Sequence, residues 1–195
     1  EYARQTRITR IIRLSIRNLS GVPSIVYGLF GVILFVNILT FGTSILSAGL
    51  TLGLLTLPWT ITASEEALKT IPNSYREGAL ALGATKWQSI RTNVLPYALP
   101  GMLTGTVLGL ARAAGETAPI MFTGAAFYLP YLPKSLKDQF MALPYHLYIM
   151  ATQHHDIARV RPLAYGTALV LIALVLGMNM VAVVVRYRLR KKRRI

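Results

Sequence analysis

No charged residue occurs in the stretch 18–64. An α-helix needs about 20 apolar residues to cross a hydrocarbon core about 30 Å thick, so this stretch is long enough for two crossings. It predicts membrane spans at residues 22–38 and 44–63, separated by the turn sequence LTFGTS. Two later apolar runs, at residues 97–122 and 162–185, predict two more spans. The sequence therefore predicts an all-α, polytopic membrane protein that crosses the bilayer four times within this chain.

The composition agrees with a membrane protein, because 53% of the residues are apolar and only 14% are charged, against roughly 25% charged in an average soluble domain. A net charge of +14 is also typical of nucleic-acid binders, so the distribution of the basic residues has to decide between the two classes. Sixteen of the 21 basic residues form three clusters, which are Arg4, Arg7, Arg10, Arg13 and Arg17, four residues at 69–91, and seven among the last ten positions.

The basic clusters also predict the topology. Lysine and arginine are enriched on the cytoplasmic side of membrane proteins. We therefore expect both ends of this chain and the 64–96 segment to be cytoplasmic, in the plasma (inner) membrane. The 126–160 connection, which carries few basic residues, then lies on the outer side.

The segment at residues 1–20 predicts a cytoplasmic amphipathic helix. Its arginines lie mostly on one side of a helical projection, and Ile8, Ile12, Ile16 and Leu19 lie on the other. Such a helix can lie in an anionic membrane surface and contact lipid. A basic flank that only fixes the topology is a second reading, and the sequence leaves both open. The C-terminal sequence RYRLRKKRRI has no apolar face and predicts a topological anchor.

The cytoplasmic segment between the second and third spans contains the polar stretch SYREGALALGATKWQSIRTNVLP. Ser74 and Glu77 have the spacing of a capping box, which predicts that a helix begins at Ser74. Gly83 predicts the end of that helix, because glycine readily adopts the left-handed conformation found at helix C-termini. Thr85 and Gln88 repeat the capping-box spacing. A second helix is therefore predicted to begin there and to continue into the third span.

Two short helices joined by a turn are also the geometry of a DNA-reading helix-turn-helix. This alternative, a membrane-tethered DNA-binding regulator, is disfavoured because membrane spans hold the unit at both ends and leave no third helix for a soluble core. The stretch therefore predicts a surface that is presented to a cytosolic protein, with no nucleic-acid partner.

The same stretch resembles the EAA loop of permeases from ATP-binding-cassette (ABC) importers. Six residues carry the pattern at the required spacing, namely Glu77, Gly78, Ala79, Gly83, Leu95 and Pro96. Gly78 replaces the usual alanine, and Asn93 replaces the usual isoleucine or valine. The resemblance implies a type I ABC importer permease (MetI-like) fold and a single transmembrane domain over residues 1–195. It also implies that these six residues couple to a cytosolic ATPase, on which the 64–96 loop docks.

The third predicted span carries small residues at every fourth position, at Gly101, Gly105, Gly109 and Ala113. Such a stripe lets two membrane helices approach closely, so it predicts a helix-packing face. The neighbouring helix belongs either to this chain or to another subunit, and the sequence leaves that choice open.

Two opposite charges, Arg112 and Glu116, lie one helical turn apart in the same span. At 1.5 Å per residue, Arg112 lies about 22 Å from the cytoplasmic end, beyond the middle of the hydrocarbon core. A charge at that depth costs at least about 2.5–3.5 kcal/mol, so it needs a partner or water. The two residues either only neutralise each other, or they line an aqueous path in which Arg112 attracts an anion and Glu116 orients it.

Three sequences, PSIVYGLFG, LPWTITASEEALKTIP and RAAGETAP, are similar to those of phosphate-importer permeases, and closer to their A-type than to their C-type subunit. The resemblance implies that Arg112 and Glu116 are the substrate-path residues of a phosphate permease subunit. It implies as partners a second homologous permease subunit, a dimer of ATPase subunits and an extracytoplasmic phosphate-binding protein. Such permeases usually have six spans, so upstream spans are expected as well. A permease for another oxyanion, such as molybdate or sulfate, and an anion channel remain alternatives.

The outer 126–160 segment predicts a short re-entrant or interfacial helix that includes the apolar residues around 145–151. His154, His155 and Asp156 suggest a metal site, but adjacent side chains diverge around a helix, so a solvated loop without metal is favoured. The sequence contains neither a phosphate-binding GxxxxGK[ST] loop nor a Cys/His zinc spacing. We therefore expect no cofactor and no enzymatic activity on this chain, and ATP with Mg²⁺ on the partner ATPase.

Overall fold

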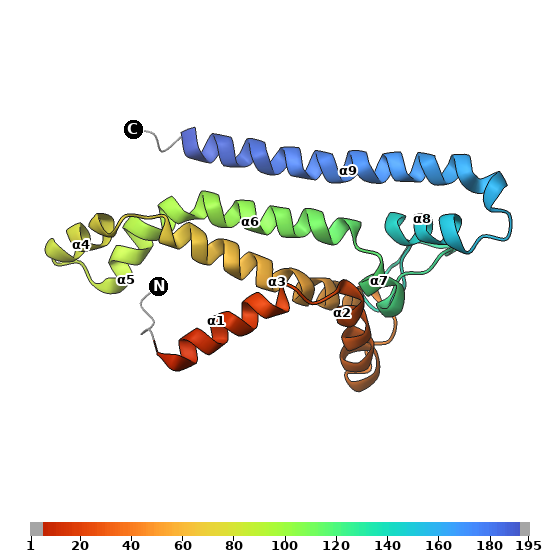
Figure 1. Ribbon diagram of the computed structural model, residues 1–195, viewed down its shortest axis with the longest axis horizontal. Coiled ribbons are helices and arrows are strands. Elements are labelled where there is room, and N and C mark those ends of the chain that lie inside the picture. The colour runs from red at the N-terminus through yellow and green to blue at the C-terminus, as the bar shows by residue number, and fades with distance from the viewer. Residues whose placement is uncertain (1–5, 192–195) are drawn as a thin grey trace. The chain divides into compact units, whose positions relative to one another are not determined.

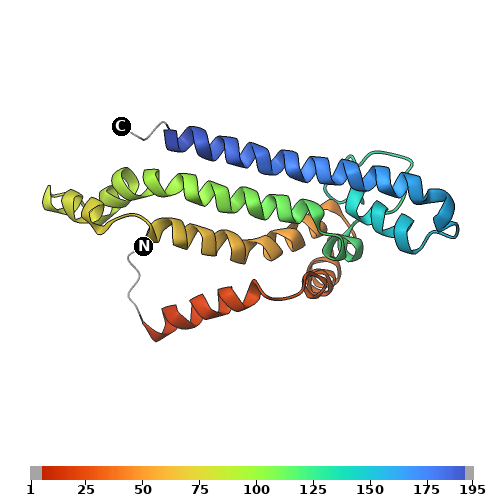
Figure 2. The ribbon, with the colours of Figure 1, turned by 45° about the horizontal axis from the view of Figure 1, so that its top comes forward.

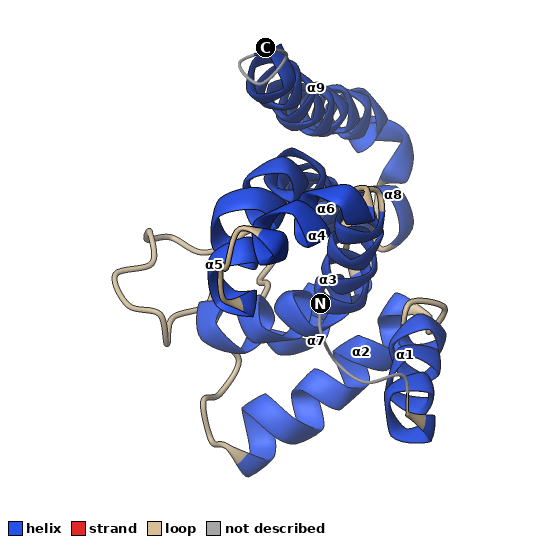
Figure 3. Cartoon of the chain, turned by 90° about the vertical axis from the view of Figure 1, so that its left-hand side faces the viewer, coloured by secondary structure: helices blue, strands red, loops and turns tan. Residues whose placement is uncertain are grey.

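The computed structural model describes residues 6–191, and its regular elements are helices (Figure 1, Figure 3). In chain order they are α1 (Arg7–Leu19), α2 (Ser24–Gly31), η1 (Val32–Ile38), α3 (Ile45–Lys69), α4 (Asn73–Ala81), α5 (Lys86–Ser89), η2 (Ile90–Val94), α6 (Leu95–Gly115), α7 (Ala118–Thr123), α8 (Leu143–Thr152) and α9 (Ile157–Lys191). The elements η1 and η2 are π-helical. Extended pairing within residues 6–191 is limited to one isolated bridge between Ala125 and Phe140. The predicted all-α class is confirmed.

Three helices are long and apolar enough to cross a membrane, namely Ile45–Lys69, Lys86–Gly115 and Ile157–Arg188. They contain the predicted span at 162–185, all but the first residue of the one at 44–63, and most of the one at 97–122. The first predicted span, at 22–38, is not a single long helix. Residues 24–38 are helical, as α2 followed by η1, but this stretch is too short to cross a membrane by itself. It reaches the required length only together with α1, from which it is bent by 101°. The described chain thus has three candidate spans, or four if the bent pair counts as one.

The third predicted span is shorter than the apolar run suggested. α6 ends at Gly115, the next two residues are not helical, and α7 begins at Ala118. Pro119 explains the break, because proline lacks an N–H and its ring collides with the carbonyl group four residues earlier, which is that of Gly115. The predicted continuation of this helix to residue 122 is therefore wrong.

The described residues divide into two compact units. Unit 1 comprises residues 6–20, 58–109 and 179–191, and unit 2 comprises residues 21–57 and 110–178. The long helices α3, α6 and α9 contribute residues to both units.

Unit 2 has a core in which hydroxyl side chains meet glycines. Its fully buried polar side chains are those of Ser44, Ser47, Thr51 and Thr123. Each of these hydroxyls donates to a backbone carbonyl at 2.7–3.3 Å, so the core leaves none of the four without a partner. Gly31 of α2 lies against Thr51 so closely that a Cβ atom there would collide with the threonine side chain. The close approach explains why PSIVYGLFG has glycine at this position.

α3 begins in unit 2, after the turn that the sequence LTFGTS predicts. Ser44 caps the helix, because its Oγ accepts a hydrogen bond from the Ser47 N–H at 3.2 Å. The N–H groups of Ile45 and Leu46 donate to carbonyl oxygens of the 126–160 segment, both at 2.9 Å. The first donors of α3, which have no partner inside the helix, are thus satisfied by the segment predicted to be on the outer side.

In unit 1, α4 and α5 form the bend that joins α3 to α6 (Figure 2). Next to this bend, Val94 of η2 and Ala98 of α6 are buried, with 0% and 1% of their surface exposed. η2 lies directly before the Leu95–Pro96 pair. Because Pro96 has no N–H to give to the carbonyl four residues earlier, the wider π-helical turn accommodates it within a continuous helix.

Candidate functional site

α4 carries the first half of the predicted coupling loop. It begins at Asn73 with Pro72 at the N-cap, and no side chain caps it. Pro72 sets this start, because its ring fixes φ, here −56°, at a value that suits entry into a helix. Ser74 consequently lies inside the helix, and the predicted capping box of Ser74 with Glu77 is wrong. Glu77 is exposed and is left as a surface carboxylate.

The end of α4 is formed as the sequence predicts. Gly83 has a φ of +82°, in the left-handed region. Its N–H donates to the Leu80 carbonyl at 3.0 Å, and the Ala84 N–H donates to the Ala79 carbonyl at 3.1 Å. These two bonds make a Schellman motif, so the prediction that Gly83 ends this helix is confirmed.

The second half of the loop starts at the predicted capping box. The Gln88 N–H donates to Thr85 Oγ1 at 3.2 Å, and the Thr85 N–H donates to Gln88 Oε1 at 2.8 Å. α5, η2 and α6 then follow as the single helix Lys86–Gly115. The predicted continuation of the second short helix into the third span is confirmed.

Accessible apolar side chains mark the surface of this loop. Leu82 and Trp87 are 90% and 66% exposed, so both offer apolar surface within an otherwise polar stretch. Neither residue belongs to the EAA pattern, although both are large apolar side chains within a polar stretch. The sequence pattern did not single them out, and their accessibility becomes evident only in the structure.

The six predicted coupling residues divide into two groups. Glu77, Gly78 and Gly83 are exposed. Ala79 is buried, and the Leu95–Pro96 pair is half-buried at the start of α6. The first group is therefore accessible at the surface, and the second is at least partly covered by the chain itself.

The small-residue stripe on α6 faces α3 within unit 1. A Cβ atom on Gly101 would lie 2.7 Å from Ala67 Cβ, and one on Gly105 would collide with Ala63. Gly109 is buried and Ala113 is half-buried. At Gly101 and Gly105 the neighbouring helix thus belongs to the same chain.

Arg112 and Glu116 come together in unit 2, where α6 ends. Arg112 Nε lies 3.4 Å from Glu116 Oε1, and the two side chains are 44% and 15% exposed. The carboxylate is thus largely shielded, while the guanidinium remains within reach of a solute. Glu116 also lies just before α7, whose N-cap is Thr117.

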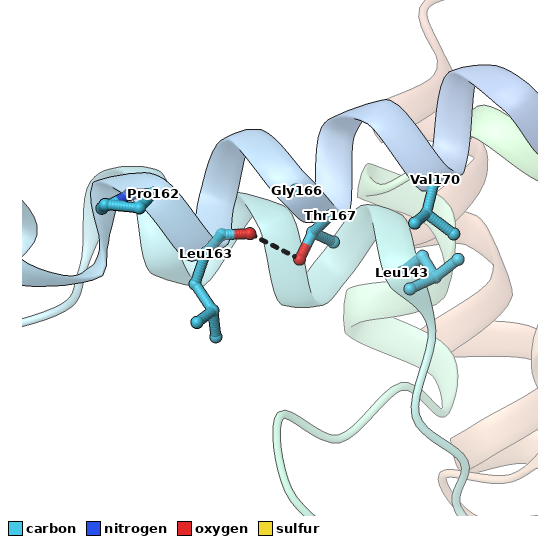
Figure 4. A pocket seen from close by; sticks show the side chains of 6 residues that line it. All are labelled: Leu143, Pro162, Leu163, Gly166, Thr167 and Val170. Carbon is cyan, nitrogen blue, oxygen red and sulfur yellow. Dashed lines mark hydrogen bonds between the residues drawn. The ribbon is translucent and has the colours of Figure 1, made fainter.

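Two grooves offer further space for a ligand. In unit 2 an open groove of about 450 Å³ is lined by Leu143, Pro162, Leu163, Gly166, Thr167 and Val170 (Figure 4). Its lining carries no charge, and the Thr167 hydroxyl donates to the Leu163 carbonyl at 3.0 Å. In unit 1 a groove of about 400 Å³ contains Arg13 and Glu65, which neutralise each other as an ion pair at 2.8 Å. The first groove thus offers an uncharged lining, and the second offers a cation that is already paired with a carboxylate.

The predicted N-terminal amphipathic helix is present as α1. No residue of it is buried, and Ile8 and Ile12 are 70% and 53% exposed. Arg13 joins it to Glu65 of α3. The exposed isoleucines are compatible with the lipid-surface reading, and the topology reading stays a prediction. Arg4 and the last four residues of the C-terminal cluster lie outside the described residues.

The 126–160 segment contains the predicted short helix, which is α8 (Leu143–Thr152). Beyond it the rings of His154 and His155 stack with centroids 4.4 Å apart, and His154 Nδ1 accepts a hydrogen bond from the Asp156 N–H at 3.2 Å. In the part of the chain that the structure describes, no three His, Cys, Asp or Glu side chains are grouped so that they could hold a metal ion.

Known proteins resemble this chain over most of its length. The phosphate transport system permease protein PstA 1 of Mycobacterium tuberculosis is 35% identical over 191 residues, which are 97% of this chain and 60% of that protein. The probable phosphate transport system permease protein PstA of Methanocaldococcus jannaschii is 33% identical over 184 residues, 94% of this chain and 63% of that protein. The probable ABC transporter permease protein YqgI of Bacillus subtilis is 38% identical over 123 residues, 63% of this chain and 42% of that protein.

The chain thus spans 42% to 63% of the length of these three relatives. No solved structure shows significant similarity to it. The family described as "Binding-protein-dependent transport system inner membrane component" matches residues 2–195, and the long apolar helices agree with an integral membrane protein. The chain belongs to this family of inner membrane transport components.

Proposed function

We propose that this chain is the permease subunit of an ATP-driven phosphate import system and forms half of its translocation pathway. The observation that carries the proposal is the similarity to two phosphate transport permeases over 97% and 94% of the chain. A second homologous permease subunit forms the other half, and an extracytoplasmic phosphate-binding protein delivers the substrate. A dimer of ATPase subunits, which binds ATP and Mg²⁺, supplies the energy.

In this proposal Arg112 is the group that phosphate meets in the path. The planar N–H donors of a guanidinium match the oxygens of a tetrahedral oxyanion better than a lysine ammonium does. Glu116, whose carboxylate lies 3.4 Å from the guanidinium, compensates the positive charge when no anion is present and lowers its cost in the membrane. It also competes with phosphate for the arginine, which keeps binding weak enough for release.

The α4–α5 loop receives the ATPase. A groove on the ATPase covers Leu82 and Trp87, whose exposed apolar surface stabilises the contact by roughly 25 cal/mol per Å² buried, and Glu77 supplies a charged contact beside them. The helix Lys86–Gly115 begins in this loop and also bears Arg112. A displacement of the loop by the closing ATPases is therefore transmitted along the element that carries the substrate-path arginine.

Uptake of labelled phosphate into vesicles that contain the full assembly tests the proposal. We expect uptake that needs ATP, that unlabelled phosphate suppresses, and that molybdate and sulfate do not. A control without the ATPase subunits should show no uptake. Stronger suppression by molybdate or sulfate assigns the permease to that oxyanion instead, and phosphate entry without ATP assigns the chain to an anion channel.

A further inference from the structure

The C-terminal end of α3 is held by a side chain of α4. α3 ends at Lys69, so the carbonyl groups of its last turn lack partners inside the helix. Arg76 reaches back to this end, with Nη2 donating to the Leu68 carbonyl of the last turn at 3.0 Å and Nη1 donating to the Ile71 carbonyl, in the linker that follows α3, at 2.7 Å. Two longer contacts of 3.5 Å join the same Nη1 to the start of α4. A cation is thus placed at the negative end of the α3 dipole, where it is favoured.

The preceding residue attaches α4 to its other neighbour in unit 1. The Tyr75 ring packs edge-on against Tyr97 of α6, with the centroids 5.0 Å apart and the planes at 65°. The side chains of adjacent helix residues point about 100° apart, so Tyr75 and Arg76 can contact two different helices. Ala79, one turn further on, is buried. α4 is therefore fixed to α3 through Arg76 and to α6 through Tyr75.

We propose that Arg76 is a positioning residue that locks α4 to the end of α3, so that a displacement of the α4–α5 loop moves α3 together with α6. The attachment rests on the contacts above, and only the source of the displacement rests on the proposed function. Residues 70–72, which join the two helices, are not helical, so the chain connection alone leaves a hinge. The fork of two guanidinium nitrogens bridges two carbonyl oxygens, which the single ammonium of lysine cannot do in the same way.

A distance measurement tests the attachment directly. The chain has no cysteine, so Ile61→Cys within α3 and Ala81→Cys at the end of α4, both exposed, can carry a pair of nitroxide labels. Dipolar electron paramagnetic resonance is recorded on the assembled transporter in vesicles of phosphatidylcholine and phosphatidylglycerol. We expect Arg76→Gln to broaden the distance distribution, and Arg91→Gln, which removes an equal charge from η2, to leave it unchanged. An unchanged distribution in Arg76→Gln overturns the proposal.

The transport readout separates positioning from simple folding support. We expect the Arg76→Gln transporter to capture the ATPase normally but to move about tenfold less phosphate per ATP hydrolysed, the change expected from the loss of one charge-assisted hydrogen bond. A purely structural role would reduce the amount of assembled transporter and leave this ratio unchanged, which also overturns the proposal.

The test also covers the cases in which the Arg76→Gln variant does not assemble or the parent assembly does not transport phosphate. If Arg76→Gln does not assemble, Arg76→Lys replaces it, because this variant keeps the charge and loses only the fork. A parental distance distribution in Arg76→Lys then overturns the proposal. If the parent assembly moves no phosphate, the proposed function fails, while the nitroxide distances still decide whether Arg76 fixes α4 to α3.

Discussion

The two ends of the helix Lys86–Gly115 are built by different means. Its start is specified within a few residues, by the Thr85 capping box, and the side chains of Leu82 and Trp87 beside it are exposed. Its far end is specified from outside the helix, by Pro119, and it places an exposed arginine beside a shielded carboxylate. The start thus depends on local backbone geometry, and the far end depends on charge. We therefore expect charge substitutions at the far end to affect transport more than changes of geometry at the start.

The largest effect is expected for Arg112→Gln. The change removes the guanidinium that the proposed path uses, and it leaves the shielded Glu116 carboxylate without this partner. A hydrogen bond to a charged group contributes about 1.5–3 kcal/mol, so loss of the guanidinium donors should lower phosphate uptake by about 10- to 100-fold. Uptake into vesicles measures this loss, and ATPase capture should stay at the parental level. Arg112→Lys keeps the charge and loses the planar donors, so its phosphate uptake should lie between that of the parent and that of Arg112→Gln.

A double variant shows whether Arg112 does more than neutralise its neighbour. If neutralisation is its only role, combining Arg112→Gln with Glu116→Gln removes both charges and should restore uptake. We expect the double variant to stay as inactive as Arg112→Gln, because the anion has lost its donor. Restored uptake would reduce the site to a structural ion pair.

An intermediate effect is expected for Gly83→Val, at the coupling end. The φ of +82° at Gly83 is costly for a β-branched residue, by roughly 1–2 kcal/mol. The turn should shift, and capture of the ATPase by the immobilised permease should weaken about tenfold. Gly83→Asn is the matched control, because asparagine tolerates the left-handed region. Parental capture by Gly83→Val would mean that the ATPase does not recognise the shape of this turn.

Much of the fold can be predicted because its signals are local. The charge-free runs predict the long helices, and Gly83, Thr85 and Gln88 define the turn between α4 and α5 through their local hydrogen bonds and backbone conformation. The failures come from prolines that compete with other signals. Pro72 starts α4 ahead of the Ser74 capping box, and Pro119 breaks a run that looks continuous when only hydropathy is considered.

The candidate site divides in the same way. Arg112 and Glu116 can be identified from sequence because charge inside an apolar run is rare and costly. The proposed role of Arg76 cannot, because it depends on where the Leu68 carbonyl of α3 and the Ile71 carbonyl of the following linker lie in space. The neighbour of Gly101 also had to come from the structure, since a small-residue stripe indicates close packing without indicating which helix packs there.

The smallest effect is expected for Thr85→Ala. The change removes the hydroxyl oxygen that accepts the Gln88 N–H at 3.2 Å, at a cost of about 1 kcal/mol. The rest of the helix is held by its packing, so only the first turn should fray. The Gln88 amide should then exchange with deuterium about fivefold faster, and Thr85→Ser should exchange at the parental rate.

Phosphate uptake by Thr85→Ala should change little, because a frayed first turn still leaves Leu82 and Trp87 available to the ATPase. Among the substitutions at the two helix ends, this one should therefore have the smallest effect on phosphate uptake. A loss of uptake as large as that of Arg112→Gln would show that the capped turn limits transport. The coupling end would then control the rate, and the charge pair would be secondary.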